Sequence, residues 1–181
     1  MMFLLRMLMK KRLREMDPLH VSMTGVRMGE RFLQIGCHDR ALLSGLAAKV
    51  GLSGGAFVAA LDPSDAKNAE AVGRKIGALI EIQHIDGGRN WPYADGQFDM
   101  IVVDDTADTF SAREQQTAIL RNAHRALRAG GRIEIIARQR SNAPAFNAEK
   151  ELSAAGFKPV RLLAERDGFH FIEGLRPAGK S

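Results

Sequence analysis

One stretch, residues 31–51 (RFLQIGCHDRALLSGLAAKVG), constrains the fold more than any other part of the chain. It opens with a short apolar run of strand length, Arg31 to Ile35, and continues after Gly36 with apolar residues at helical spacing until Gly51. A glycine after the first strand of an α/β fold lets a ligand approach the backbone, while the next helix points its N-terminus there. The stretch therefore predicts a nucleotide-binding strand–turn–helix unit. The predicted helix buries Leu42, Leu43, Leu46, Ala47 and Val50.

The rest of the chain alternates between strand-like and helix-like segments. Strands are predicted at 56–61, 79–85, 98–103 and 133–137, and helices at 66–76, 111–127 and 145–155. The continuous apolar run 56–61 is typical of a parallel strand covered on both faces. Two further strands, 157–165 and 169–175, are joined by Asp167-Gly168, a strong hairpin signal. We therefore predict an α/β fold with a Rossmann-like, doubly wound, seven-stranded sheet, mostly parallel with a C-terminal antiparallel hairpin.

Local residues also predict where two of these helices begin. Ser64 or Asp65 could cap the helix 66–76. Ser111 and Glu114 form a Ser-x-x-Glu capping box for the helix 111–127. The pair Gly130-Gly131 is expected to end that helix with a positive φ.

The turn at Gly36 resembles the first motif of the class I S-adenosylmethionine-dependent methyltransferases. That motif runs hydrophobic, hydrophobic, Asp/Glu, x, Gly, x, Gly, x, Gly. Gly36 matches the first glycine, whereas Gln34 replaces the acidic residue and His38 and Arg40 occupy the other glycine positions.

Two further segments are similar to the same family. Residues 86–103, from Asp86 through Trp91-Pro92-Tyr93 to the apolar run after Phe98, are similar to its "D…lPf.d.sFDvV" region. Residues 127–133, LRAGGRI, closely match its "LkpGGrl" turn. The predicted antiparallel hairpin is the methyltransferase arrangement, which dehydrogenase Rossmann domains lack. A dehydrogenase is the weakest alternative, because residues 36–41 depart from Gly-x-Gly-x-x-Gly.

The resemblance implies S-adenosylmethionine as cofactor and a site at the carboxyl ends of the strands. Asp62 closes the second strand, where Rossmann-like folds bind ribose hydroxyls. The aspartate after the third strand, here Asp86, commonly contacts the adenine amine in that family. The expected cofactor-binding residues are Gly36, Cys37, His38, Asp62, Pro63, Asp86, Gly87 and Asp104.

Two functions follow from this resemblance. The favoured one is methyl transfer to a small-molecule acceptor, with a lipid-like molecule as one option and with Arg40 turned outward or paired with the cofactor carboxylate. In the alternative, His38 and Arg40 block the pocket, and the domain is an inactive methyltransferase-like scaffold that binds a protein partner or a membrane surface. Methyl transfer mainly requires alignment, so no catalytic residue is assigned.

The acidic pair Asp104-Asp105 follows the fourth predicted strand. It is placed to bind substrate or a divalent metal, or to cap the start of the loop. Metal-dependent catechol-type methyltransferases resemble this in having an aspartate there, but they also need an acidic or amide pair after the fifth strand. Only Asn142 is near that position, so no metal is expected.

Residues 1–29 are expected to form an N-terminal amphipathic helix and linker ahead of a methyltransferase-like domain, 30–181. Residues 1–17 hold five basic residues against Glu15 and Asp17, which is +3 of the net charge of +5. This segment is too short and too charged for a bilayer span of ~20 apolar residues. Residues 1–16 could lie on an anionic membrane surface, or could pack on their own domain or on a partner subunit.

Composition also bears on disulfides, on the cellular compartment and on nucleic-acid partners. The single cysteine, Cys37, allows no internal disulfide and fits a cytoplasmic protein. No basic stripe interleaved with aromatic residues occurs, so nucleic acid is not an expected partner.

Overall fold

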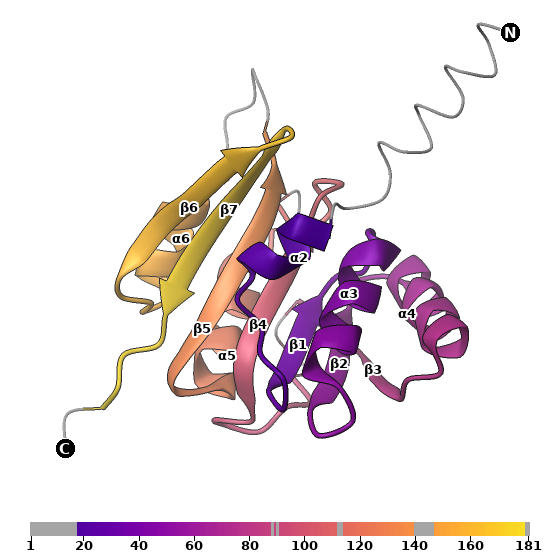
Figure 1. The fold of residues 1–181 in the computed structure, drawn as a ribbon. Helices are drawn as coiled ribbons and strands as arrows, with labels where there is room; N and C mark the ends of the chain where they lie inside the picture. The colour runs from indigo at the N-terminus through magenta and orange to yellow at the C-terminus, as the bar shows by residue number, and fades with distance from the viewer. Residues whose placement is uncertain (1–17, 88, 90, 112–113, 140–146, 180–181) are drawn as a thin grey trace, which may run out of the picture.

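The computed structural model describes residues 18–87, 89, 91–111, 114–139 and 147–179, and these form one seven-stranded sheet between two layers of helices (Figure 1). The strands are β1 (Arg31–Ile35), β2 (Gly55–Ala60), β3 (Ile80–His84), β4 (Phe98–Asp105), β5 (Leu127–Arg138), β6 (Val160–Arg166) and β7 (Phe169–Leu175). The helices are α2 (Pro18–Met23), α3 (Arg40–Val50), α4 (Pro63–Ile76), α5 (Gln116–Ala126) and α6 (Ala148–Ala154).

The strand order in the sheet is β3-β2-β1-β4-β5-β7-β6. The first five strands in this order are parallel to one another, and β7 is antiparallel to both of its neighbours, β5 and β6. The predicted fold class is confirmed. From β1 the chain builds outward to β2 and β3, and it then returns to add β4 on the other side of β1. In doubly wound sheets, ligands bind outside the carboxyl ends of the strands at such a reversal.

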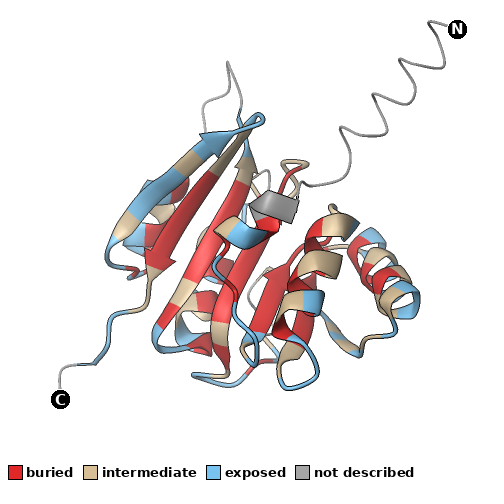
Figure 2. Cartoon of the chain, in the orientation of Figure 1, coloured by how far each residue is buried: buried red, intermediate tan, exposed pale blue. Residues whose placement is uncertain are grey.

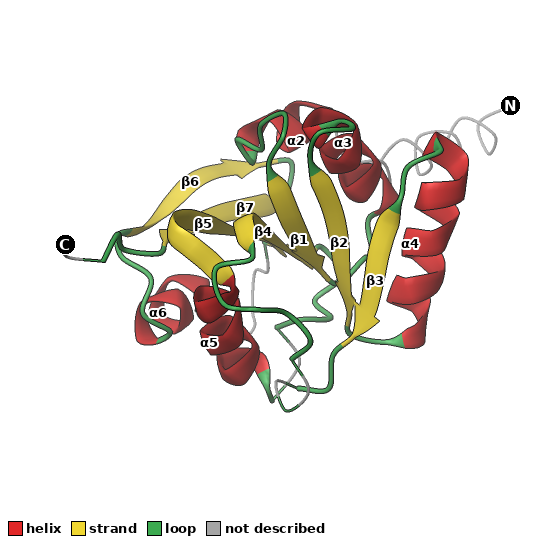
Figure 3. Cartoon of the chain, turned by 90° about the horizontal axis from the view of Figure 1, so that it is seen from below, coloured by secondary structure: helices red, strands yellow, loops and turns green. Residues whose placement is uncertain are grey.

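Helices α2, α3 and α4 cover one face of the sheet, and α5 and α6 cover the other (Figure 3). The β3–β4 loop, which has no helix in its described part, helps to fill the second face. Tyr93 of this loop packs edge to face between Trp91 and Phe98 and donates a hydrogen bond to the Val58 carbonyl (3.2 Å). The strands β1, β2 and β4 are mostly buried, and the edge strand β6 is mostly exposed (Figure 2).

The strand–turn–helix unit forms as its pattern predicts. Strand β1 covers the predicted residues 31–35, and all five predicted apolar residues of α3 are buried. Gly51 ends α3 with φ 64°, in the region that glycine tolerates best. The C-terminal hairpin is confirmed as well, since Asp167 and Gly168 take φ values of 53° and 80°. Positive φ at both central residues suits the two-residue turns that match strand twist.

Two predicted helix starts are wrong because a carboxylate nearby takes the backbone donors. Helix α4 begins at Pro63 rather than 66, since Asp62 accepts hydrogen bonds from the backbone N–H groups of Ser64 (2.8 Å) and Asp65 (3.1 Å). Helix α5 begins at Gln116 rather than at the 111–114 capping box. There, Asp105 accepts from the backbone N–H groups of Phe110 (2.9 Å) and Ser111 (3.0 Å) and holds this segment in a turn.

Two other expectations also need correction. Gly130-Gly131 does not end the helix: α5 stops at Ala126, and Gly130 (φ 72°) lies within β5. Part of the expected linker 19–30 is helical, because Pro18 occupies the first turn of α2, where proline is tolerated. Val21 of α2 packs closely on Gly45 of α3, because a Cβ added to Gly45 would lie 2.7 Å from Val21 Cγ2.

The predicted helix over residues 1–17 lies outside the described residues. None of the helices that the structure does describe combines the length and apolar character needed to cross a membrane.

Candidate functional site

The predicted site residues follow four neighbouring strands. Gly36, Cys37 and His38 come after β1, Asp62 and Pro63 after β2, and Asp86 and Gly87 after β3, while Asp104 is the penultimate residue of β4. These strands are parallel, so all four segments lie at the same edge of the sheet.

Gly36 lies directly against β4. It has φ 76°, and its N–H donates to the Ala59 carbonyl of β2 (3.0 Å). A Cβ on this residue would lie 3.2 Å from the Asp104 carbonyl oxygen and 3.4 Å from Leu61 Cδ1. Both the backbone conformation and the close approach therefore favour glycine at the end of β1.

Gln34 shows why the departure from an acidic residue is tolerated here. Its side chain is fully buried beneath the turn, and its Nε2 donates to the Gly36 carbonyl (3.0 Å). An ionised carboxylate has no proton to donate to that carbonyl, whereas the amide does. No described residue donates to Gln34 Oε1, which leaves one buried acceptor beneath the site.

Two side chains of α4 hold the Cys37 peptide group. Asp65, only 3% exposed, accepts from the Cys37 N–H (Oδ1, 2.7 Å) and from the Leu61 N–H (Oδ2, 2.8 Å). Asn68 Nδ2 donates to the Cys37 carbonyl (2.8 Å). The turn after β1 is thus fixed by the helix that follows β2.

Asp104 holds the other end of the turn. It is fully buried, and its Oδ2 accepts from the Asp39 N–H (2.7 Å), while Oδ1 accepts from the hydroxyl (2.6 Å) and the N–H (3.2 Å) of Thr106. Asp39 in turn caps α3 by accepting from the N–H groups of Ala41 and Leu42. The carboxylates of Asp104 and Asp105 thus support two different segments.

The site is strongly acidic. Burial raises the pKa of Asp39 and of Asp65, and the neighbouring Asp104 raises both further. Burial also raises the pKa of the Cys37 thiol far above its usual range, with added contributions from these three carboxylates. Cys37 is therefore a neutral, buried thiol rather than a nucleophile.

His38 and Arg40 are both solvent-exposed. Among the described residues that are not glycine, only Asp108 and Asp167 have positive φ, so the backbone at His38 and Arg40 does not require glycine. Side chains at these two positions are therefore compatible with the turn.

The segment after β3 contains the predicted site residues Asp86 and Gly87. Asp86 is exposed, and its carbonyl accepts from the Arg89 N–H (2.8 Å). Gly87 (φ 50°) faces the residue before α5, because a Cβ on it would lie 2.5 Å from Gln115 Cγ. The hydrogen bonds of Asp65, Asn68 and Asp104 join the segments after β1, β2 and β4, and Asp86 lies at the same edge of the sheet.

Sequence reasoning missed three residues of the site: Asp39, Asp65 as an anchor, and Asn68. An aspartate just before an apolar helical stripe is a usual N-cap pattern, which could have identified Asp39. Asp65 and Asn68 are three residues apart and so share a helix face. Nothing local indicates that this face meets Cys37.

Comparison with known proteins agrees with the fold. The family model described as "Methyltransferase domain" matches residues 33–135, from β1 into β5. A comparison with curated protein sequences finds no match.

Solved structures share the fold at low sequence identity. A SAM-dependent methyltransferase from Aquifex aeolicus is 20% identical, with a TM-score of 0.75 over 91% of this chain and 92% of that one. A SAM-dependent O-methyltransferase from Thermotoga maritima is 17% identical, with a TM-score of 0.64 over 90% and 65% of the two chains. The [4+2]-cyclase SpnF is 15% identical, with a TM-score of 0.69 over 89% and 79%.

Proposed function

The chain belongs to the methyltransferase-domain family, and from this premise we propose that it binds S-adenosylmethionine at the Gly36 turn and transfers the methyl group to a small-molecule acceptor. Methyl transfer is the general activity of the family. The cofactor, the residues that bind it and the class of acceptor are the parts that we propose.

The observation that carries this proposal is the charge around the turn. A dinucleotide pyrophosphate would use the free N–H groups of a glycine-rich turn. Here, Asp65 takes the N–H of Cys37, and Asp104 takes the N–H of Asp39. Buried carboxylates repel phosphates and attract cations, and S-adenosylmethionine carries a sulfonium and an ammonium group. The donor set therefore fits this cofactor better than NAD.

S-adenosylmethionine supplies a methyl group on a positively charged sulfur, which a nucleophile displaces at carbon. Gly36, Cys37 and His38 would present the backbone to its methionine moiety. Asp62, with Pro63 beside it, would accept from the ribose hydroxyls. The adenine would lie by Asp86 and Gly87, and Asp104 would hold the turn in place. Because the reaction needs chiefly alignment and exclusion of water, this arrangement requires no acid–base triad.

A small-molecule acceptor, including a lipid-like one, is proposed from the resemblance to small-molecule methyltransferases. The structural neighbour from Thermotoga maritima is described as an O-methyltransferase, so an oxygen atom is one candidate for the atom that accepts the methyl group. SpnF has a similar fold and is described as a [4+2]-cyclase, so cofactor binding and methyl transfer need separate measurements.

Titration calorimetry with S-adenosylmethionine, S-adenosylhomocysteine and NADH tests the cofactor. We expect the first two to bind and NADH to give no heat at millimolar concentration. Binding of NADH instead would contradict the charge argument. If none of the three binds, the inactive scaffold replaces the enzyme.

Replacing Asp62 by alanine is expected to weaken S-adenosylhomocysteine binding by about 10- to 150-fold, because a hydrogen bond to a charged group contributes roughly 1.5–3 kcal/mol. Asp62 also caps α4, so Asp62→Ala removes two functions at once. Asp62→Ser is the matched variant, since serine keeps the cap but is too short to reach a ribose. Affinity should fall in both variants and stability mainly in the alanine one. Wild-type affinity in Asp62→Ser would refute the ribose assignment.

His38→Gly and Arg40→Gly should change S-adenosylhomocysteine affinity only modestly, by less than about tenfold, because both side chains are exposed. Arg40→Gly should also cost less than about 1 kcal/mol of stability, because Arg40 is the first residue of α3 and the full glycine penalty applies to a helix interior. Calorimetry and urea denaturation of each variant measure the two effects. If the wild type does not bind and the double variant does, the side chains block the site and the enzyme proposal fails.

A further inference from the structure

Strand β3 is an edge strand far from the reversal between β1 and β4. It has one neighbouring strand, β2, in the described sheet. One row of its backbone N–H and C=O groups therefore points away from the sheet, which makes the edge a template for another strand.

The two edges of the sheet differ in how they are protected. Edge strand β6 has a register irregularity between Leu162 and Ala164 and carries Arg161, Glu165 and Arg166. Bulges and charged residues of this kind discourage pairing between edges. Strand β3, with the sequence IEIQH, pairs with β2 in an uninterrupted register and carries only Glu81 as an acidic residue, with no lysine, arginine or proline.

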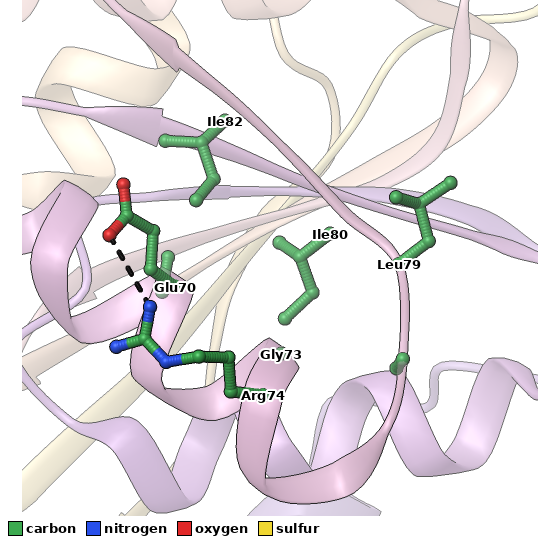
Figure 4. A pocket seen from close by; sticks show the side chains of 8 residues that line it. Glu70, Gly73, Arg74, Leu79, Ile80 and Ile82 are labelled. Atoms are coloured by element: carbon green, nitrogen blue, oxygen red, sulfur yellow. Dashed lines mark ion pairs between the residues drawn. The ribbon is translucent and has the colours of Figure 1, made fainter.

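An apolar groove of about 340 Å³ runs beside this edge, between β3 and α4 (Figure 4). Ile80 and Ile82 line it from the strand, and the ion pair of Arg74 and Glu70 (3.7 Å) lies beside it on the helix. Leu79, which precedes the strand and also lines the groove, is 85% exposed. Such a groove can take apolar side chains from an added strand.

We propose that β3 pairs antiparallel with β3 of a second copy of this chain, about a twofold axis at Ile82, independently of the proposed function. In this register Ile82 faces its own counterpart, and Glu81 lies opposite the partner's Gln83. Directly opposite residues of an antiparallel pair share a face. The isoleucines of both strands thus lie on the α4 side, and their two grooves become continuous.

The same register avoids like charges across the axis and pairs hydrogen-bonding groups. Each Glu81 carboxylate meets an amide donor of the partner's Gln83 rather than a second carboxylate, and this occurs twice because a twofold interface repeats every contact. Strand pairing of the two copies joins their seven-stranded sheets into one. Ile80 then lies opposite the partner's His84 on the α4 side. The self-complementary pairing of Glu81 with Gln83 favours a second copy over an unrelated peptide.

Sedimentation velocity of the full chain over a range of concentrations tests the dimer, and two substitutions of the exposed Gln83 test the register. Gln83→Lys should tighten the dimer, because each lysine faces the partner's Glu81. Gln83→Glu should weaken it by placing like charges opposite each other. Two cross-strand pairs per dimer give an expected change of about 2- to 30-fold in the dimer Kd in each direction at low salt.

Ile82→Lys, which places two lysines at the axis, should give a monomer, whereas Leu162→Lys on the opposite edge should leave the dimer unchanged. Circular dichroism checks that Ile82→Lys folds. If it does not fold, the opposite shifts in dimer Kd of Gln83→Lys and Gln83→Glu test the proposal. A wild type that stays monomeric at every concentration overturns the proposal. So does a dimer whose Kd shifts in the same direction, or not at all, in the two Gln83 variants.

Discussion

Replacement of Asp65 by alanine is expected to destabilise the protein by about 2–6 kcal/mol. The carboxylate accepts from two backbone N–H groups, those of Cys37 and Leu61, and it is almost fully buried. Each buried donor left without a partner costs roughly 1–3 kcal/mol. Domains of this size have only about 5–15 kcal/mol of net stability, so this loss is a large fraction of the total.

Urea denaturation followed by circular dichroism measures the effect. Asp65→Asn should lie between the wild type and Asp65→Ala, since one amide oxygen can still accept from a donor. Asp95→Ala is the control. Its ion pair with Arg125 (2.6 Å) is exposed on both sides, so its removal should change stability by less than about 1 kcal/mol.

Under conditions in which Asp65→Ala is folded, it should also bind S-adenosylhomocysteine more weakly, because no carboxylate then holds the Cys37 N–H. Equal stability of Asp65→Ala and the wild type would show that the carboxylate does not support the turn. An unchanged affinity with lowered stability would instead place the cofactor away from Cys37.

Gly36→Ala is expected to reduce S-adenosylhomocysteine affinity at least about tenfold and to cost about 1–2 kcal/mol of stability. A side chain at φ 76° is strained, and its Cβ would press on the Asp104 carbonyl oxygen at 3.2 Å. The turn must then move away from β4 and into the space where the cofactor is proposed to lie.

Gly77→Ala is the matched control for this experiment. Gly77 ends α4 with a similar φ of 66°, but nothing lies within 4 Å of an added Cβ. Gly77→Ala should therefore lower the free energy of unfolding through backbone strain and leave the affinity for S-adenosylhomocysteine unchanged. An equal loss of affinity in both variants would mean that Gly36 acts only through global stability, and wild-type affinity in Gly36→Ala would remove the turn from the binding site.

The sequence alone determined the elements that depend on neighbours in the chain. The apolar spacing of α3 and its glycine stop predicted the helix and its five buried residues. Asp167-Gly168 predicted the hairpin, because a two-residue turn needs positive φ where these residues tolerate it. These signals are local, and the structure confirms them. The methyltransferase resemblance also came from short motifs, and the family match over residues 33–135 confirms it.

Only the tertiary structure decided which carboxylate serves which backbone donor. Asp65 reaches Cys37 across 28 residues of chain, and Asp104 reaches Asp39 across 65. The capping box at Ser111 failed for the same reason, since the Asp105 carboxylate takes the Ser111 N–H. A buried N–H donates to whichever acceptor folding brings close, and parallel strands bring distant segments to one edge. Sequence pattern thus predicted a candidate site at one edge of the sheet, while through-space competition for hydrogen bonds set the geometry and charge of that edge.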